Sequence, residues 1–241
     1  MLGFLYKDFR VALKSWFMIL GLYLLLNVIL IPAVFNGMRM KSDEQDTGIF
    51  VLMIVLFFYM LYLLVSACGK EIFQGDEKML WQCFAISTPG AMKAQIQSKY
   101  LVILTMNLGI TFVCMISDTL YVLIAGDAGI SMTIALLFLF CWNIIKESVS
   151  LPFVYAFGVS YGNSVKILML SVGFFLVTVY GLFGDISFFL NKNILESLKE
   201  LLGSGNVIWV LAIMPYIAML AYYVSYRISI LVYRRGLENN E

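Results

Sequence analysis

The sequence contains no histidine and few charged residues. Charged side chains make up only 13% of its 241 residues. Histidine is the base of Ser–His hydrolases, a ligand in HExxH metalloproteases and a common haem ligand. Its absence excludes these enzyme classes and any histidine-bound metal or haem.

Cysteine is also scarce. The four cysteines are Cys68, Cys83, Cys114 and Cys141. They fall in or beside hydrophobic runs, and no two of them form a CxxC pair. Neither a disulfide framework nor a cysteine metal site is expected, and no basic patch is dense enough to predict nucleic-acid binding.

Long apolar runs fill the chain instead. Hydrophobic residues make up 62% of the sequence and the mean hydropathy is +0.92, whereas a soluble domain is about 45–50% apolar. We expect the excess to face lipid, and six runs are long enough to cross a bilayer as helices. They are residues 16–35, 49–67, 101–125, 131–151, 165–183 and 207–226. The sequence therefore predicts an all-α membrane protein with one transmembrane domain over residues 1–241.

The orientation in the membrane follows from lysine and arginine, which accumulate on the cytoplasmic side. Twelve of the 16 fall on the side that holds both termini, and four fall on the other side. The sequence therefore predicts that both termini are cytoplasmic. The twelve are Lys7, Arg10, Lys14, Lys70, Lys78, Lys93, Lys99, Lys146, Lys166, Arg227, Arg234 and Arg235.

Two segments outside the six runs are amphipathic. In residues 1–15 apolar side chains recur at helical spacing, which predicts a helix in the inner membrane interface; an extension of the first span is the alternative. The apolar stripe in residues 194–202 predicts a short helix on the outer surface, ended by Gly203. Pro152 is expected to kink or end the fourth span, and Pro215 to bend the last.

The polar stretch of residues 69–99 connects the second and third spans. Within it, Asp76 is suited to cap a short helix, and Thr88-Pro89 is suited to begin a second helix that runs into the third span. The short helix carries Trp81 and Phe84, and such aromatics with charges beside them suit a groove of a soluble partner. The alternative is an interfacial helix whose aromatics lie among lipid headgroups.

Five polar residues within the predicted spans are candidate functional residues, because a charge costs about 2.5–3.5 kcal/mol at a helix centre. Four of them recur at three- and four-residue spacing and share one face of the fourth span. These four are Asn143, Lys146, Glu147 and Ser150. We expect them to face a subunit seam or the transport path, unless the span ends earlier. Asp118 falls near the outer end of the third span. The simpler alternative for this residue is a solvated position at the outer membrane surface.

The segment Gly158-Val159-Ser160-Tyr161-Gly162 has the spacing of the GxSxG nucleophile elbow. That motif requires a strand, a turn and a helix, together with a histidine base. Here the segment follows a predicted helix and no histidine exists. We expect a tight inner loop with conformational freedom, and no catalytic residue.

The stretch of residues 69–101 resembles the loop of small six-span ABC-2-type transporter permeases. The matching pieces are Phe73, Asp76-Glu77-Lys78, Trp81, Ser87 to Pro89, and Ser98-Lys99-Tyr100-Leu101. Residues 5–10 and 151–158 are also similar to that family, so the resemblance extends along the whole chain. It is most similar to permeases of bacterial exporters for amphipathic peptides, such as phenol-soluble modulins, and of bacteriocin-immunity systems.

This resemblance implies a division of labour between subunits. The chain has no GxxxxGK[ST] phosphate loop, so ATP and magnesium are expected on a separate ATPase subunit, with no cofactor or metal in this chain. The resemblance implies an exporter permease of the bacterial cytoplasmic membrane, paired with a second copy or a paralogue. The cargo implied is an amphipathic peptide, a bacteriocin or a hydrophobic antibiotic.

The residues implied to couple to the ATPase are Glu71, Phe73, Asp76, Glu77, Lys78, Trp81 and Phe84. A membrane scaffold or sensor without transport activity and an intramembrane enzyme are the alternative functions.

Overall fold

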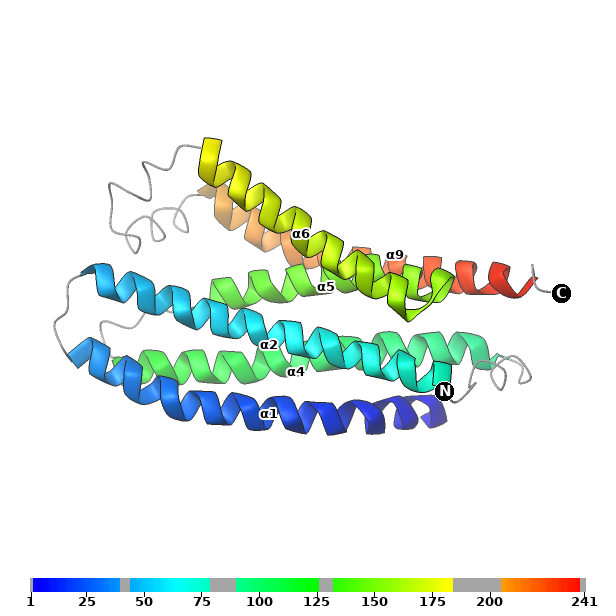
Figure 1. The fold of residues 1–241 in the computed structure, drawn as a ribbon, viewed down its shortest axis with the longest axis horizontal. Helices are drawn as coiled ribbons and strands as arrows, with labels where there is room; N and C mark the ends of the chain where they lie inside the picture. The colour runs from blue at the N-terminus through cyan, green and yellow to red at the C-terminus, as the bar shows by residue number, and fades with distance from the viewer. Residues whose placement is uncertain (1, 40–43, 79–89, 126–131, 184–204, 239–241) are drawn as a thin grey trace.

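Long α-helices form every element of the computed structural model, which describes residues 2–39, 44–78, 90–125, 132–183 and 205–238. The helices are α1 (Leu2–Arg39), α2 (Glu44–Lys78), α4 (Ala91–Ala125), α5 (Thr133–Phe157), α6 (Val159–Phe183) and α9 (Gly205–Glu238). They run back and forth along one long axis (Figure 1). The all-α fold class is therefore confirmed.

Five of these helices contain stretches that are long and apolar enough to cross a membrane, judged by length and composition. The stretches are Leu2–Val28, Ile54–Asp76, Ala91–Leu123, Thr133–Phe157 and Ala212–Arg234. Each overlaps one of the six expected spans. The remaining expected span, residues 165–183, lies within α6, which is not among the five. A sixth crossing stays a prediction.

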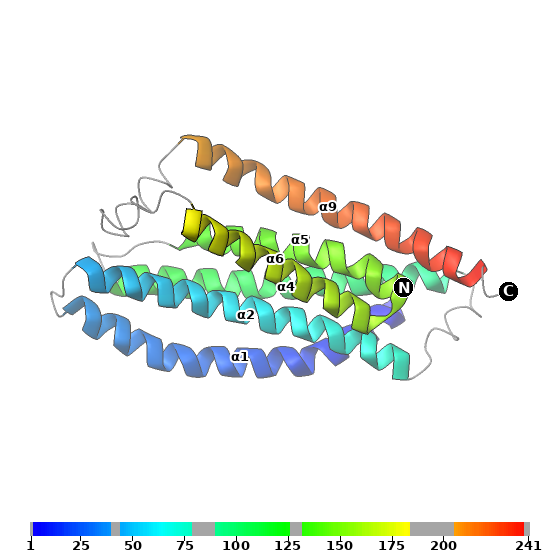
Figure 2. The same cartoon turned by 45° about the horizontal axis from the view of Figure 1, so that its top comes forward.

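The interior of the bundle is built around α4 and α5. Helix α4 packs against α1, α2, α5 and α9, and α5 also packs against α2, α6 and α9. Figure 2 shows α1 and α9 on opposite sides of the molecule. One apolar cluster joins α1, α2 and α4 with the start of α5, and a second joins α4, α5 and α9.

One end of the bundle, called the basal end, gathers the polar helix ends. The N-terminal ends of α1 and α4, the C-terminal ends of α2 and α9, and the connection from α5 to α6 all lie there (Figure 1). The lysine and arginine count assigns these same segments to the cytoplasm. The side of the membrane itself stays a prediction.

Helix α1 is uninterrupted from Leu2 to Arg39 and curved along its length (Figure 2). No break separates residues 2–15 from the first expected span. The continuous helix matches the alternative of an extended span better than a separate interfacial helix over residues 1–15.

Helix α2 extends into the stretch that was expected to be a loop. It runs to Lys78, so the prediction that Asp76 caps a new helix is wrong. The helix continues because its polar residues find partners inside the bundle, as described below. Helix α4 begins at Ala91, after Gly90 with φ 74°, so its start is later than the Thr88-Pro89 start that was expected. It runs without a break into the third span, as expected. The short helices predicted around Trp81 and over residues 194–202 lie outside the described residues.

A single residue, Gly158, connects α5 to α6. Its backbone has φ 94° and ψ 173°, a region that only glycine occupies readily. One turn later α6 packs closely on α5, since a Cβ at Gly162 would lie 2.1 Å from Cγ2 of Val154. The GxSxG segment is therefore a one-residue turn between two helices, and the loop expected there is wrong.

Pro152 does not end the fourth span. Helix α5 continues beyond it to Phe157, so the expectation that Pro152 ends the span is wrong, and the alternative of a kink stays a prediction. A proline removes one backbone donor, and its effect stays local when the following turn re-forms. Backbone hydrogen bonding is intact at the end of the helix, because the Gly158 N–H donates to the Val154 carbonyl at 2.9 Å.

Replacing Gly158 with alanine is expected to destabilise the protein. A Cβ in this backbone region costs about 1–3 kcal/mol, so the thermal unfolding midpoint in detergent should fall. Gly21→Ala is the matched control, because Gly21 is exposed on α1 and a Cβ there meets nothing within 4 Å. Equal midpoints for the two variants would contradict the strained turn.

Candidate functional site

Charged side chains from three helices meet inside the bundle at its basal end. This basal charge cluster consists of Lys7 and Asp8 from α1, Asp76 from α2, and Gln95, Ser98 and Lys99 from α4. Asp8, Asp76 and Lys99 are each 4% exposed or less. The cluster includes residues close to the C-terminal end of α2 and to the N-terminal end of α4.

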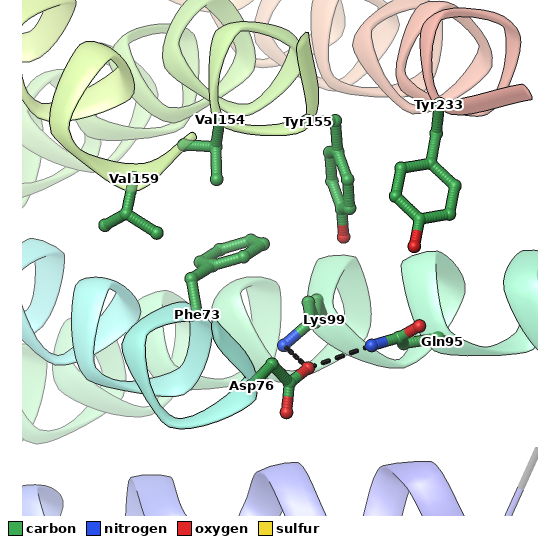
Figure 3. Close-up of a pocket in the computed structure, with 8 residues that line it drawn as sticks. All are labelled: Phe73, Asp76, Gln95, Lys99, Val154, Tyr155, Val159 and Tyr233. Carbon is green, nitrogen blue, oxygen red and sulfur yellow. Dashed lines mark hydrogen bonds and ion pairs between the residues drawn. The ribbon is translucent and has the colours of Figure 1, made fainter. Parts of the chain in front are cut away.

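Lys99 contacts both carboxylates of the cluster, and Figure 3 shows its ammonium group beside Asp76. Its Nζ lies 2.6 Å from Oδ2 of Asp76 and 3.9 Å from Oδ1 of Asp8. The same nitrogen donates to the Ile72 carbonyl at 3.3 Å and lies 4.6 Å from the ring centroid of Phe73. One ammonium group therefore joins α4 to both α1 and α2.

The two carboxylates have further donors. Asp76 also accepts hydrogen bonds from Lys7 and, at 3.0 Å, from Nε2 of Gln95. Asp8 accepts one from the Ser98 hydroxyl. Two ammonium groups thus balance two carboxylates. Buried ion pairs are tolerated when added hydrogen bonds offset the cost of removing the charges from water, and the bonds from Gln95 and Ser98 act in this way.

A second polar group lies between α2, α5 and α6. Nζ of Lys166 is 2.8 Å from both carboxylate oxygens of Glu147, which is 1% exposed. The Ser66 hydroxyl donates to the same carboxylate. Glu147 therefore joins three helices within one chain.

The other members of the predicted stripe on α5 are buried too. Asn143 donates to the side-chain oxygen of Asn107 on α4, and the Ser150 hydroxyl donates to the Glu147 carbonyl of its own helix at 3.2 Å. Lys146 is 2% exposed. The stripe is enclosed by the chain's own helices, so it does not form a surface between subunits; a place on a transport path stays a prediction.

Asp118 caps the start of α5 from the neighbouring helix. One of its carboxylate oxygens accepts the Met132 N–H at 2.8 Å and the other accepts the Thr133 hydroxyl at 3.0 Å. Met132 offers no side-chain cap, and a carboxylate suits the positive end of a helix. Asp118 is 2% exposed, so the expected solvated position is not observed.

Among the described residues, no group of three or more cysteine, aspartate and glutamate side chains is placed to hold a metal ion. The two polar groups are instead arranged to hold helices together.

A protein-family model described as "ABC-2 family transporter protein" matches residues 3–234. The chain belongs to the ABC-2 transporter family. Comparisons with curated proteins and with solved structures each gave no match. Membership implies a multi-pass membrane subunit of an ABC transporter that pairs with an ABC ATPase subunit.

The structure divides the residues proposed for ATPase coupling in this ABC-2 protein. Phe73 and Asp76 point into the bundle, where Phe73 packs edge-on against Tyr155 with ring centroids 5.6 Å apart. Glu71 is exposed and accepts a hydrogen bond from Ser15. The side chains of Glu77, Lys78, Trp81 and Phe84 lie outside the described residues. Contact with an ATPase stays a prediction for all seven.

Sequence reasoning missed Lys99, Asp8 and Lys166 as site residues. Lys99 and Lys166 were counted only in the charge balance across the membrane, and Asp8 was given no role. Lys99 did stand inside the Ser98-Lys99-Tyr100-Leu101 motif that carries the family resemblance. Its partner Asp8 lies on a different helix, and sequence spacing gives no distance between helices.

Replacing Lys99 with methionine should destabilise the ABC-2 chain strongly. Only Lys7 then faces two buried carboxylates, and breaking a buried ion pair costs about 3–5 kcal/mol. The unfolding midpoint of purified protein should fall sharply, while Lys93→Met, at an exposed position of α4, should have little effect. Lys99→Met combined with Asp76→Leu should recover part of the loss, because Lys7 and Asp8 then remain as a balanced pair. No recovery in the double variant would contradict the assigned charge balance.

Proposed function

We propose that this chain is the permease subunit of an ATP-driven exporter in the bacterial cytoplasmic membrane. The observation that carries the proposal is the family match over residues 3–234. ATP hydrolysis is assigned to the partner ATPase, because the sequence lacks a phosphate loop. Both termini are placed in the cytoplasm by the lysine and arginine distribution.

The connection between α2 and α4 is the proposed ATPase contact. It contains Trp81 and Phe84, and it lies between the end of α2 and the start of α4 at the basal end. The basal charge cluster supports a mechanical role, because Asp76 and Lys99 join these two helix ends to each other and to α1. A displacement of the connection would therefore move the three helices together.

The cargo and the second permease are the finer parts of the proposal. Amphipathic peptides, bacteriocins or hydrophobic antibiotics are the proposed cargo, because the sequence motifs resemble permeases of such exporters. A second copy or a paralogue would complete the pathway. A scaffold or sensor without transport activity and, last, an intramembrane enzyme are the competing functions.

Co-expression of the chain with candidate ABC ATPases tests the proposal. An ATPase should co-purify with the permease, and its ATP hydrolysis should change on binding. Membrane vesicles that contain both subunits should then move amphipathic peptide out of the cytoplasmic side. Failure of every ATPase to bind would favour the scaffold function.

Replacing both Trp81 and Phe84 with alanine should weaken ATPase binding. Aromatic anchors at an interface cost about 2 kcal/mol or more when truncated, so affinity should fall by more than about tenfold. The exposed pair Phe174 and Phe175 on α6, replaced in the same way, serves as the control and should leave binding unchanged. Intact binding and intact stimulated hydrolysis in the Trp81 and Phe84 variant would refute this contact.

Glu147→Gln should reduce export. The amide keeps the shape but removes the carboxylate that pairs with the Lys166 ammonium, and breaking a buried ion pair costs about 3–5 kcal/mol of stability. The contact between α2, α5 and α6 should therefore weaken, and export should fall with it. Glu147→Gln combined with Lys166→Gln removes both charges and should recover activity in the vesicle assay. Unchanged export and assembly in Glu147→Gln would exclude a functional role for this pair.

A further inference from the structure

A small cavity borders the basal charge cluster on the side of α5 and α9. Its volume is about 30 Å³. Figure 3 shows Asp76, Gln95 and Lys99 on one side of this space and Tyr155 and Tyr233 on the other. Because Phe73 and two valines line the rest, the cavity is apolar at one edge and polar across its middle.

The Tyr155 hydroxyl is the unexplained group in this cavity. Its oxygen is buried and has no hydrogen-bond partner among the described residues. The hydroxyl points from α5 toward the charge cluster (Figure 3). Leaving a buried hydroxyl unpaired costs about 1–3 kcal/mol, so its position calls for a partner that is not a protein group.

The volume of the cavity and the charged groups that line it determine which kind of molecule can bind there. A water molecule needs about 10–15 Å³ of such volume, so the space accommodates one or two waters and nothing much larger. Asp76 and Lys99 already neutralise each other at 2.6 Å. The ammonium would therefore repel a cation, and the carboxylate would repel an anion. A neutral molecule that both donates and accepts hydrogen bonds can bind both groups.

We propose that this cavity is a binding site for one or two ordered waters that bridge the Tyr155 hydroxyl to the Asp76–Lys99 pair. The waters form a polar contact between α5 and the joined helices α2 and α4. They give the Tyr155 hydroxyl a hydrogen-bond partner and add hydrogen bonds to the Asp76–Lys99 ion pair. The site does not depend on the proposed export function, because it rests on cavity volume and on one unpaired hydroxyl.

X-ray hydroxyl-radical labelling of the full chain in lipid nanodiscs tests the site. Bound water becomes a local source of radicals, so a buried ring beside it is labelled and a dry buried ring is not. Phe73 lines the cavity and is 7% exposed, and Phe58 on the same helix is 0% exposed within the apolar cluster. Phe73 should be labelled several times faster than Phe58. Equal rates would overturn the proposal.

Tyr155→Phe provides the second test. If water binds the hydroxyl, its removal should lower the melting temperature by about 2–4 °C, the shift that corresponds to one net hydrogen bond of about 1 kcal/mol in a chain of this size. Tyr222→Phe is the reference, because the Tyr222 hydroxyl donates to the Tyr100 carbonyl at 2.7 Å and its loss should cost a similar amount. A melting temperature equal to or above that of the parent would mean that the hydroxyl is dry, and would overturn the proposal.

Discussion

The ion pairs of Lys99 with Asp76 and Asp8 constrain how α1, α2 and α4 are placed. These charges are buried where neither lipid nor an apolar core can solvate them, so all three helices must turn their charged residue toward one point. On a helix, the residue four positions away faces the same direction. The apolar interior above the cluster follows from this rotation, since those residues are buried as well: Ala12, Ile72 and Ile103.

The sequence was sufficient to predict the helices but not the residues at which they begin and end. Length and apolarity predicted the fold class, because a membrane span requires a continuous apolar helix. The polar residues before Lys78 were interpreted as a loop because polarity normally indicates solvent. They continue α2 instead, since Asp76 meets Lys7 and Lys99 from other helices. Which distant residues meet is a property of packing, and one sequence does not contain it.

Polar residues inside the predicted spans show the same limit. Three- and four-residue spacing placed Asn143 and Glu147 on one face of α5, and both do face the interior. Spacing did not identify the partners, which are Asn107 on α4 and Lys166 on α6. Asn143 and Glu147 are both matched across a helix boundary, because an unmatched polar group in an apolar interior costs more than a paired one. The stripe therefore specifies contacts within one chain.

The helices differ in how they are joined at the basal end. Helices α1, α2 and α4 share a balanced charge cluster, which holds their ends together. Helix α6 is held there by the Gly158 turn and by the Lys166–Glu147 pair, and beyond Lys166 its large apolar side chains are largely exposed: Ile167, Leu168, Val172, Phe174 and Phe175. Ser66 on α2 and Lys166 on α6 both contact the carboxylate of Glu147 on α5, so this residue lies at the junction between the two parts of the bundle. The residue is costly to bury, and its position at this junction gives a physical reason for a charge at that depth.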